Sequence, residues 1–477
     1  MTKQSNKEAT IDLSVYTDHA WRRYAMETIE GRALPDIFDG MKPVGRRVLY
    51  EMARMGLTPG AEPVKTARVV GNTMGKLHPH GDSSIGSAIT TLVNSTIPPI
   101  RGIGNWGDRD DNPAAPRYTN CRLTKYGMML VDKDYLAVTP MCPNYDGKEL
   151  EPVVLPALLP NLFLNGGSGV AVSITFDLPP IEAKGILNLV RRILSGEEVT
   201  PRAAAKLTRV RYANGSYQVL TEPEDKAAWV EFWKTGRSTL RIQPKDYILD
   251  TKTATMIVPG IPLNLTMAKV IENLEADDRV KDVRNIGITK HGVDTIEIQL
   301  KPTRKASTVA QELFEDLITL VHPKLNAVQR KHAPVDDVDD IQTRIRSDSP
   351  LEILSSWCKL RVKLEQRYLV HKATRVKESI DYTNLLIKAC LNRDVVLQAL
   401  KSKTPDATLA KSLKISEEDA GRILDMQVRR LSVLDEAKLR ESLKKLEAQL
   451  KELQAWQKKP HEKVIADIKQ IESDLGL

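Results

Sequence analysis

The sequence predicts a multidomain α+β protein with a helix-turn-helix segment near its start, a mixed middle region and long helices near its end. The chain has 477 residues, more than one hydrophobic core normally serves, which suggests two to four domains. Apolar residues recur at helical spacing in the first hundred residues, and strand-like alternation begins near residue 209. A leucine repeat with heptad spacing follows near the C-terminus.

Composition excludes several classes of protein. The hydrophobic fraction of 41% is that of a soluble globular chain, and no apolar stretch reaches the ~20 residues that a membrane span needs. Residues 1–7 lack the apolar core of a secretory signal, so we expect a cytoplasmic protein. Cys121, Cys142, Cys358 and Cys390 are far apart without CxxC spacing, which argues against a zinc site or a disulfide framework.

The charge favours a polyanionic partner. The net charge is +8 and the pI is near 9.0. Basic residues outnumber the four acids of the same stretch between residues 32 and 76: Arg32, Lys42, Arg46, Arg47, Arg54, Lys65, Arg68 and Lys76. A single lysine is more often a solvated surface charge, but a cluster beside a helix-turn-helix pattern favours contacts with phosphate.

The first two helices have recognisable ends. We expect a helix over residues 18–30, with Asp18 as its cap and Gly31 as its stop. Pro43 begins a second helix at a position where its missing N–H costs little, and Gly56 ends that helix.

The next two helices form the helix-turn-helix pattern. Residues 66–76 and 82–94 are both helical, with the short turn LHPHG between them. Asp82 is the expected N-cap of the second helix. The expected apolar faces are Ala67, Val70 and Met74 on the first helix and Ile85, Ile89, Leu92 and Val93 on the second.

A polar segment over residues 101–116 is expected to be a loop that presents Arg117 and Tyr118. It contains Asp108, Asp110 and Asp111, which we interpret as a solvated turn because they lack the strand setting of a metal-binding Asp-x-Asp.

The middle of the chain predicts an α+β domain. Residues 209–213 and 216–221 alternate around Asn214-Gly215, a specific hairpin signal. A helix and three more strands follow, over residues 266–275 for the helix and 239–242, 255–258 and 295–300 for the strands.

The chain becomes helical from about Pro350, with a heptad of leucines at 439, 443, 446, 450 and 453. Two interpretations are open: an amphipathic helix that packs on its own domain, or antiparallel coiled-coil arms that end in a dimer contact. We favour the arms, because two long helical stretches flank a compact helical segment at residues 416–434.

Tyr118 is the candidate nucleophile. A tyrosine with its ordinary pKa near 10 attacks phosphate poorly without help. The adjacent Arg117 offers a guanidinium fork that suits phosphate oxygens. His80 could stabilise the same oxygens or relay the phenolic proton, and His78 could support it. An isolated tyrosine is usually structural, so the case depends on these residues occurring together.

Four runs in this order resemble the breakage-reunion (A) subunit of bacterial type IIA DNA topoisomerases, the family of gyrase A and topoisomerase IV A. They are GRALPD at 31–36, DGMKPVGRRVLY at 39–50, KLHPHGDS at 76–83 and AAPRYT at 114–119. The resemblance is dense over residues 20–180 and thinner beyond.

The resemblance implies four parts. Residues 1–30 would be an N-terminal arm and helix in contact with a partner subunit. Residues 31–155 would be a winged-helix DNA-cleavage domain. Residues 156–335 would be a tower domain, and residues 336–477 coiled-coil arms with a helical dimerisation region at the C-gate.

The resemblance also assigns residues. Tyr118 would form a transient 5′-phosphotyrosyl link, with Arg117 and His80 serving the scissile phosphate. Val170 falls on the position of an apolar wedge that kinks the duplex. The other implied DNA contacts are Arg32, Lys42, Arg46, Arg47, His78 and Ser83.

Three positions depart from the family pattern. Gly45 replaces a histidine or glutamine and removes one phosphate contact. Ser87 stands where an acid is common, which puts fluoroquinolone binding in doubt although Ser83 is retained. Asn120 replaces a glutamate after the Tyr-Thr pair.

The implied assembly is an A2B2 heterotetramer on double-stranded DNA, with a homodimer of this chain at its centre. The sequence has no GxxxxGK(S/T) phosphate loop, so the resemblance assigns ATP and Mg²⁺ to a separate ATPase/TOPRIM B subunit. The sequence also has no Gln-Arg-Arg-Gly-Gly-Lys-Gly run, and we expect a chain without a C-terminal DNA-wrapping domain, although a truncated chain would look the same. We therefore expect relaxation or decatenation, as in topoisomerase IV or a phage-encoded enzyme, in a bacterial cell or a phage-infected host.

Two other functions compete with this one. A catalytically silent scaffold would keep the fold and bind DNA without cutting it. A helix-turn-helix repressor would need neither long terminal arms nor the Arg117–Tyr118 pair.

Overall fold

The computed structural model describes residues 12–107, 112–211, 217–260, 265–288, 294–302, 305–330, 343–425 and 436–477. It divides into two compact units, Met1–Arg361 with Ile465–Leu477, and Val362–Val464. None of the helices in these described ranges combines the length and the apolar character that a bilayer crossing requires.

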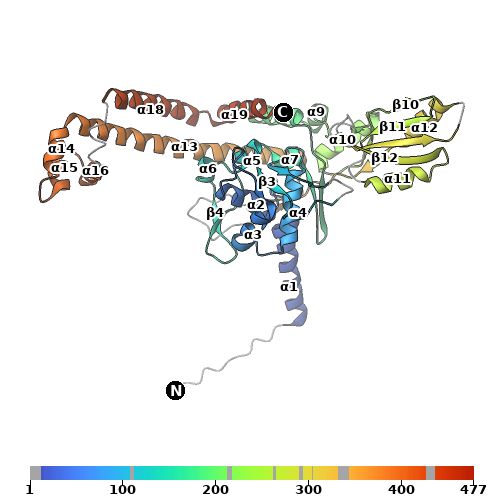
Figure 1. Cartoon of the computed structure of the whole chain (residues 1–477), viewed down its shortest axis with the longest axis horizontal. Helices are drawn as coiled ribbons and strands as arrows, with labels where there is room; N and C mark the ends of the chain where they lie inside the picture. The colour runs from blue at the N-terminus through green and yellow to red at the C-terminus, as the bar shows by residue number, and fades with distance from the viewer. Residues whose placement is uncertain are drawn as a thin grey trace, which may run out of the picture. The chain divides into compact units, whose positions relative to one another are not determined.

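The first helix starts earlier than expected. α1 (Leu13–Thr28) is capped by Asp12, whose carboxylate accepts a hydrogen bond from Ser14 N at 2.7 Å. Asp18 lies inside the helix and pairs with Arg22. The π-helical segment η1 (Ile29–Ala33) then continues through Gly31, so the predicted cap and the predicted stop were both wrong. No residue of α1 is buried, and Figure 1 shows this helix projecting from the rest of the first unit.

The next three helices agree with the predicted boundaries to within two residues. They are α2 (Pro43–Arg54), α3 (Thr66–Lys76) and α4 (Asp82–Val93). A three-stranded antiparallel sheet accompanies them, in the order β1 (Val64–Lys65), β3 (Asn120–Leu123), β2 (Ile100–Ile103). The predicted loop at 101–116 was therefore wrong at its start, because residues 101–103 pair with β3.

Two details of the helix pair differ from the sequence interpretation. Gly81, not Asp82, is the N-cap of α4, and the Asp82 carboxylate accepts from Ser83 N instead. On α3 the buried positions are Thr66, Val69, Val70 and Thr73, whereas Ala67 and Met74 are exposed. The expected face of α4 is confirmed at Ile85, Ile89 and Leu92.

Short elements lead to an exposed hairpin. They are α5 (Lys125–Leu130), α6 (Lys133–Leu136), the paired strands β4 (Met141–Pro143) and β5 (Leu150–Pro152), and α7 (Asn161–Asn165). The hairpin consists of β6 (Gly167–Ala171) and β7 (Ile174–Leu178), and Ser173 in its turn has a φ of 61°.

The middle region is mixed α and β, as predicted. One part of it has three helices and a three-stranded sheet of order β14-β9-β8, whose last strand comes later in the chain. The elements are α8 (Ala183–Leu194), α9 (Pro201–Leu207), α10 (Pro223–Thr235), β8 (Tyr217–Val219), β9 (Leu240–Pro244) and β14 (Thr319–Val321). The predicted Asn214-Gly215 turn lies outside the described residues. Within them β8 pairs with β9, with Tyr217 opposite Pro244.

A four-stranded antiparallel sheet of order β10-β11-β13-β12 packs with two helices. The elements are β10 (Ile248–Asp250), β11 (Thr255–Pro259), β12 (Val280–Ile288), β13 (Asp294–Leu300), α11 (Met267–Glu275) and α12 (Ala306–Asp316). Met256, Ile296 and Ile298 of the strands form one core with Leu274 and Leu313 of the helices. β15 (Ala327–Arg330) and β16 (Thr343–Arg346) pair with each other and lead back toward the N-terminal elements.

Long helices complete the chain. α13 (Pro350–Leu391) has 42 residues, and the elements after it are α14 (Arg393–Ala399), α15 (Pro405–Leu413), α16 (Glu417–Leu424), α18 (Glu436–Gln457) and α19 (Pro460–Leu475). Leu385, Val396, Leu409 and Ile423 belong to the core of the second unit. The five heptad leucines of α18 are half-buried, and Gln457 donates to Leu369 O of α13 at 3.2 Å. The heptad period is thus visible in the structure, while a coiled-coil arm stays a prediction.

Candidate functional site

Tyr118 lies on the surface, in a turn that follows Pro116. Its side chain is 64% exposed, and its backbone N–H donates to Ala115 O at 2.8 Å. The Arg117 guanidinium carbon lies 4.7 Å from the centroid of the Tyr118 ring. Because Arg117 is exposed as well, the phenol and the cation beside it are both accessible to a large ligand.

The start of α3 holds this turn in place. Thr66 N donates to Thr119 O at 3.0 Å, and Ala67 N donates to Pro116 O at 3.1 Å. The first N–H groups of a helix have no partners within the helix, so the turn satisfies two of them. Inside, the Thr119 hydroxyl donates to the buried Thr66 hydroxyl at 2.9 Å. Tyr118 is therefore an exposed side chain on a backbone that is held on both sides.

A second group of polar side chains surrounds the histidine pair. Arg47 makes a bidentate contact with Glu151 of β5, with both N–O distances 2.6 Å. Arg47 Nη1 also lies 2.8 Å from His78 Nδ1, and His78 Nε2 lies 3.3 Å from His80 Nδ1. His78 is buried and His80 is exposed. Four side chains from α2, β5 and the turn between α3 and α4 thus form one connected series.

The environment of His78 opposes its protonation. Burial, then the charge of Arg47 and then His80 lower the pKa of His78 from 6.5 to about 4. His78 is consequently a neutral imidazole at physiological pH.

Arg46 lies in the interior, which does not agree with the predicted contact to the DNA backbone. Its side chain donates to both oxygens of the buried Asp39, at 2.6 and 3.1 Å, and to Met41 O at 3.2 Å. Only 5% of Arg46 is exposed, since it projects from the core face of α2 together with Leu49. Arg46 therefore has a role in the fold through Asp39, and its contact with the DNA backbone stays a prediction.

Arg47 also differs from the expectation. Its donors are directed at Glu151 and His78, and its side chain is largely covered. In this geometry Arg47 holds His78 in place. Its contact with a DNA phosphate stays a prediction.

Lys42 lies beside the exposed hairpin. A Cβ placed on Gly169 would be 3.4 Å from Lys42 Nζ and 2.1 Å from Ala33 O, so only glycine permits this approach of β6 to η1. Burial lowers the pKa of Lys42, and no carboxylate among the described residues pairs with it. A half-buried ammonium without a counter-charge is a favourable partner for a phosphate.

Three other predicted residues are on the surface. Val170 is 79% exposed near the tip of the β6–β7 hairpin, and Arg32 of η1 and Ser83 of α4 are exposed. The role of Val170 as a wedge stays a prediction, because single exposed apolar side chains are common on protein surfaces.

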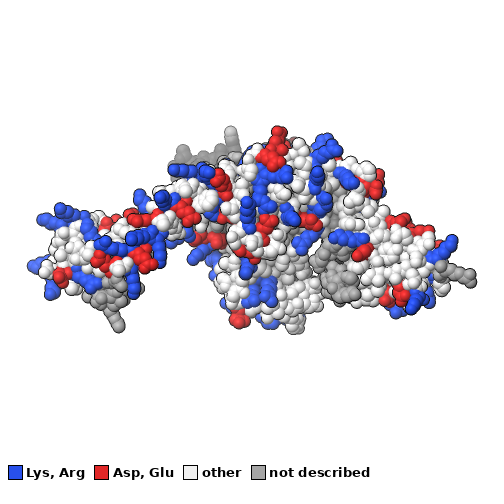
Figure 2. All heavy atoms as spheres, turned by 90° about the horizontal axis from the view of Figure 1, so that it is seen from above, with Lys and Arg blue, Asp and Glu red and all other residues white. Residues whose placement is uncertain are grey.

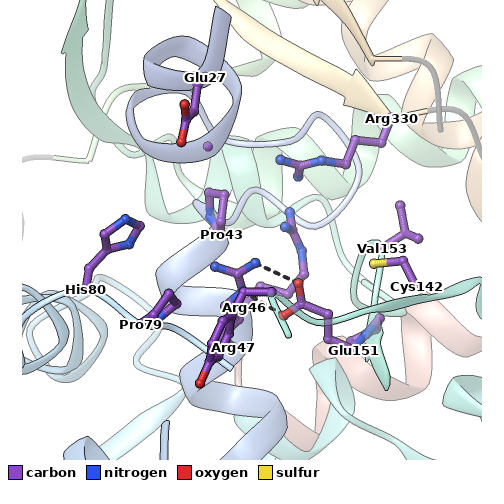
Figure 3. A pocket seen from close by; sticks show the side chains of 13 residues that line it. Glu27, Pro43, Arg46, Arg47, Pro79, His80, Cys142, Glu151, Val153 and Arg330 are labelled. Atoms are coloured by element: carbon purple, nitrogen blue, oxygen red, sulfur yellow. Dashed lines mark hydrogen bonds and ion pairs between the residues drawn. The ribbon is translucent and has the colours of Figure 1, made fainter. Parts of the chain in front are cut away.

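A pocket of about 380 Å³ adjoins the connected series. Figure 3 shows dashed contacts to Glu151, with Arg46, Arg47, His80 and Arg330 among the side chains that line it. Arg330, which lines the pocket, donates from its backbone N–H to the Asp36 carboxylate at 3.1 Å. Burial and the neighbouring Asp39 raise the pKa of Asp36 to about 6.

The structure brings some predicted residues together and leaves others apart. His78, His80 and Arg47 touch, Arg117 stacks on Tyr118, and Lys42 lies against the hairpin of Val170. Within the described residues no hydrogen bond or ion pair joins Tyr118 to His80. Pro116 does lie against α4 at Gly86, so the tyrosine turn and His80 flank the same helix.

Sequence reasoning missed Glu151 and Asp39. Glu151 is 104 residues from its partner Arg47, and no local pattern connects them. Asp39 had a usable signal, because Arg46 and Leu49 share one helix face at i and i+3.

Neither surface charge nor acidic clusters define the site by themselves. On the face shown in Figure 2, Lys and Arg side chains alternate with Asp and Glu. Among the described residues, no three His, Cys, Asp or Glu side chains gather where they could hold a metal ion. Asp108, Asp110 and Asp111 lie outside the described ranges.

Comparison with known proteins identifies the same family that the sequence runs resemble. A family model for the A subunits of DNA gyrase/topoisomerase IV matches residues 32–471. The chain is 32% identical to the A subunit of DNA topoisomerase 4 from Caulobacter vibrioides, over 87% of this chain and 55% of the relative. It is 30% identical to the corresponding protein from Neisseria gonorrhoeae, over 98% and 63%. It is 31% identical to the A subunit of a chloroplastic/mitochondrial DNA gyrase from Nicotiana benthamiana, over 94% and 48%. The chain thus spans about half to two thirds of the length of these relatives.

Proposed function

The chain belongs to the family of DNA gyrase/topoisomerase IV A subunits, and from this premise we propose that it is the DNA-cleaving component of a type IIA topoisomerase. The observation that carries the proposal is the placement of Tyr118, which is exposed, stacked with Arg117 and held by the start of α3. The relatives are named for topoisomerase 4 and gyrase, and the proposed substrate is double-stranded DNA.

The chemistry is an exchange of one phosphodiester for another. The Tyr118 hydroxyl gives its proton to water, its oxygen forms a bond to the 5′ phosphate, and the 3′ oxygen leaves and takes a proton from water to become a hydroxyl. The reverse attack by that hydroxyl reseals the strand. Arg117 offsets the charge that develops on the phosphate oxygens. The covalent link conserves the bond energy, so resealing needs no new energy source.

The surrounding elements fit this task. In the proposal, α2, α3, α4 and the β1-β3-β2 sheet form a winged-helix cleavage domain, and the mixed region to residue 335 is the tower. Arg32 and Lys42 contact backbone phosphates, and Val170 wedges between base steps at a cost of about a few kcal/mol per step. The helices from residue 336 onward form coiled-coil arms and a dimer contact.

The assembly proposed is a homodimer that joins two B subunits in an A2B2 complex in the cytoplasm. Each Tyr118 cuts one strand, and a second duplex passes through the break, so the result is relaxation or decatenation. Following the family resemblance, the proposal places Mg²⁺ and the ATPase on the B subunit. No step on this chain is routed through a metal.

One assay tests the cleavage step. The chain, its B subunit, Mg²⁺ and supercoiled plasmid are mixed and stopped with denaturant, and protein attached to 5′ DNA ends is measured. We expect Tyr118→Phe to abolish attachment and to leave DNA affinity within about twofold, because only the nucleophilic oxygen is removed. Tyr382→Phe is a matched control, since Tyr382 also stacks with an arginine, Arg422 at 5.3 Å, but lies in the second unit.

Two results would contradict the proposal. Attachment that survives in Tyr118→Phe would move the nucleophile elsewhere. Normal DNA binding by the wild type with no attachment, in the presence of an active B subunit, would favour the silent scaffold.

A further inference from the structure

The series Glu151–Arg47–His78–His80 determines where protons can sit on the two histidines. Arginine only donates hydrogen bonds and stays charged. Arg47 Nη1 is 2.8 Å from His78 Nδ1, so His78 Nδ1 must accept and carries no proton. The neutral His78 therefore has its proton on Nε2.

The position of the His78 proton also determines the tautomer of His80. The Nε2–H of His78 faces His80 Nδ1 at 3.3 Å, and the two rings meet edge-on with centroids 4.6 Å apart. A proton on His80 Nδ1 would set two N–H groups against each other. His80 Nδ1 is therefore the acceptor, and the ring proton of His80 lies on Nε2.

Glu151 supports the beginning of the series. Its carboxylate accepts from Arg47 Nε and Nη2 and fixes the plane of the guanidinium, which directs Nη1 at His78. Glu151 and His78 are both buried, whereas His80 is exposed and lines the pocket. The series thus runs from a buried anchor to an accessible imidazole.

We propose that Glu151, Arg47 and His78 are positioning residues that hold His80 Nδ1 as a hydrogen-bond acceptor and leave the ring proton of His80 on Nε2. This inference rests on the proposed function and deepens it. In the strand exchange His80 donates a hydrogen bond from Nε2 to a phosphate oxygen, and it neither takes the Tyr118 proton nor gives up its own. Of the two roles that the sequence allows for His80, the structure favours stabilisation of the phosphate.

The first test measures the tautomer directly and needs no activity. Nitrogen NMR of histidine-labelled full-length chain at pH 7, with His80→Gln to assign the signal, distinguishes a protonated ring nitrogen from a bare one. We expect Nε2 of His80 to be protonated and Nδ1 to be bare. Glu151→Gln should convert His80 to a mixture of tautomers, because Arg47 loses its bidentate partner. Glu149→Gln should not, since Glu149 pairs with Arg54 at 2.5 Å on the same hairpin but outside the series.

The second test separates donation from proton transfer. Gln can donate from its Nε2 but cannot act as a base at neutral pH. We expect His80→Gln to keep the cleavage rate within about tenfold of wild type, while His80→Ala loses about a hundredfold, the effect of removing one oxyanion donor. DNA affinity should stay unchanged in both, so the loss appears in the rate alone.

Each outcome decides between the explanations. A protonated Nδ1 on His80, or equal losses in His80→Gln and His80→Ala, would overturn the inference. A wild type that forms no covalent adduct would overturn the proposed function instead. The NMR measurement would still decide the tautomer of His80, because it needs no activity.

Discussion

Neighbouring arginines in this chain have different tasks. Arg46 is buried on Asp39, and Arg47 connects Glu151 to His78. The difference follows from helix geometry, because successive residues on a helix are about 100° apart and only Arg46 shares the core face with Leu49. A charge count over α2 treats the two alike, and only their partners distinguish them.

Removing the Arg46 side chain should destabilise the protein. Arg46→Ala leaves the Asp39 carboxylate buried without its counter-charge, which typically costs about 3–5 kcal/mol. Chemical denaturation of the purified chain measures this loss. Arg32→Ala is the control, because an exposed arginine changes stability by less than about 0.5 kcal/mol. Equal stability of the two variants would mean that the buried ion pair is not formed.

Arg32 and Lys42 should instead determine the salt dependence of DNA binding. Each phosphate contact contributes about 0.9 to the slope of log affinity against log salt, so Arg32→Ala and Lys42→Ala should each flatten it by about one unit. Fluorescence anisotropy with a short duplex between 50 and 200 mM salt, roughly the range over which such contacts show, measures the slope. An unchanged slope in either variant would remove that residue from the DNA contacts.

Individual residues were only partly predictable from the sequence. The exposed Arg117–Tyr118 pair and the contact between His78 and His80 follow from short local runs. Glu151 does not, because it reaches Arg47 only through the fold of a hairpin over a hundred residues away. The interior position of Arg46 could have been read from its spacing to Leu49.

At the scale of elements, local signals worked best where they were strong. Pro43 at the start of α2 and the glycine-containing turn between α3 and α4 fixed those boundaries closely. The predicted start of α1 was wrong because Asp12 and Asp18 are both suitable N-caps. Only the structure shows that Asp12 is the one used. The start of α3 holds the turn of Tyr118 through hydrogen bonds between residues far apart in sequence. No local sequence pattern predicts such bonds.

The β6–β7 hairpin should bend DNA through Val170. Val170→Ser removes the apolar wedge and should reduce the bend, because a polar side chain gains less from lying between bases. The bend is measured by energy transfer between dyes at the two ends of a duplex. Ile248→Ser, on the exposed strand β10, is the control and should not change the bend. If Val170→Ser bends DNA as the wild type does, the hairpin is not the wedge.

At the scale of the whole molecule, the chain divides into two compact units, and its division into four parts stays a prediction. The boundary between the two units lies within α13 and not in a linker. The sequence composition therefore does not change at this boundary. The predicted cleavage and middle regions share the first unit, because strands such as β15 return to the N-terminal segment, where Ile37 N donates to Val328 O at 2.8 Å. Sequence periodicity shows the elements but not these long-range closures.

The pH dependence of stability should reveal the buried His78. The unfolded chain protonates this histidine near pH 6.5 and the folded chain only near pH 4, so the unfolded state holds more protons in that window. The contribution of His78 to stability therefore falls as the pH drops from about 6.5 to about 4. Asp36 acts in the opposite direction, because its folded pKa of about 6 lies above the ordinary value of 3.8.

A difference measurement separates the two groups. Denaturation of wild type and His78→Gln at several pH values between 4 and 7, roughly the His78 window, cancels the Asp36 contribution, which both chains share. The stability advantage of the wild type should shrink toward the acid end. Parallel curves would mean that His78 is not held neutral in the fold.

The most direct measurement of the central claim is the identity of the residue attached to DNA. The trapped complex is digested with nuclease and protease, and the peptide that carries nucleotide mass is sequenced by mass spectrometry. We expect a 5′-linked nucleotide on Tyr118, in a peptide that also contains Thr119. A nucleotide on any other residue of this chain would contradict it.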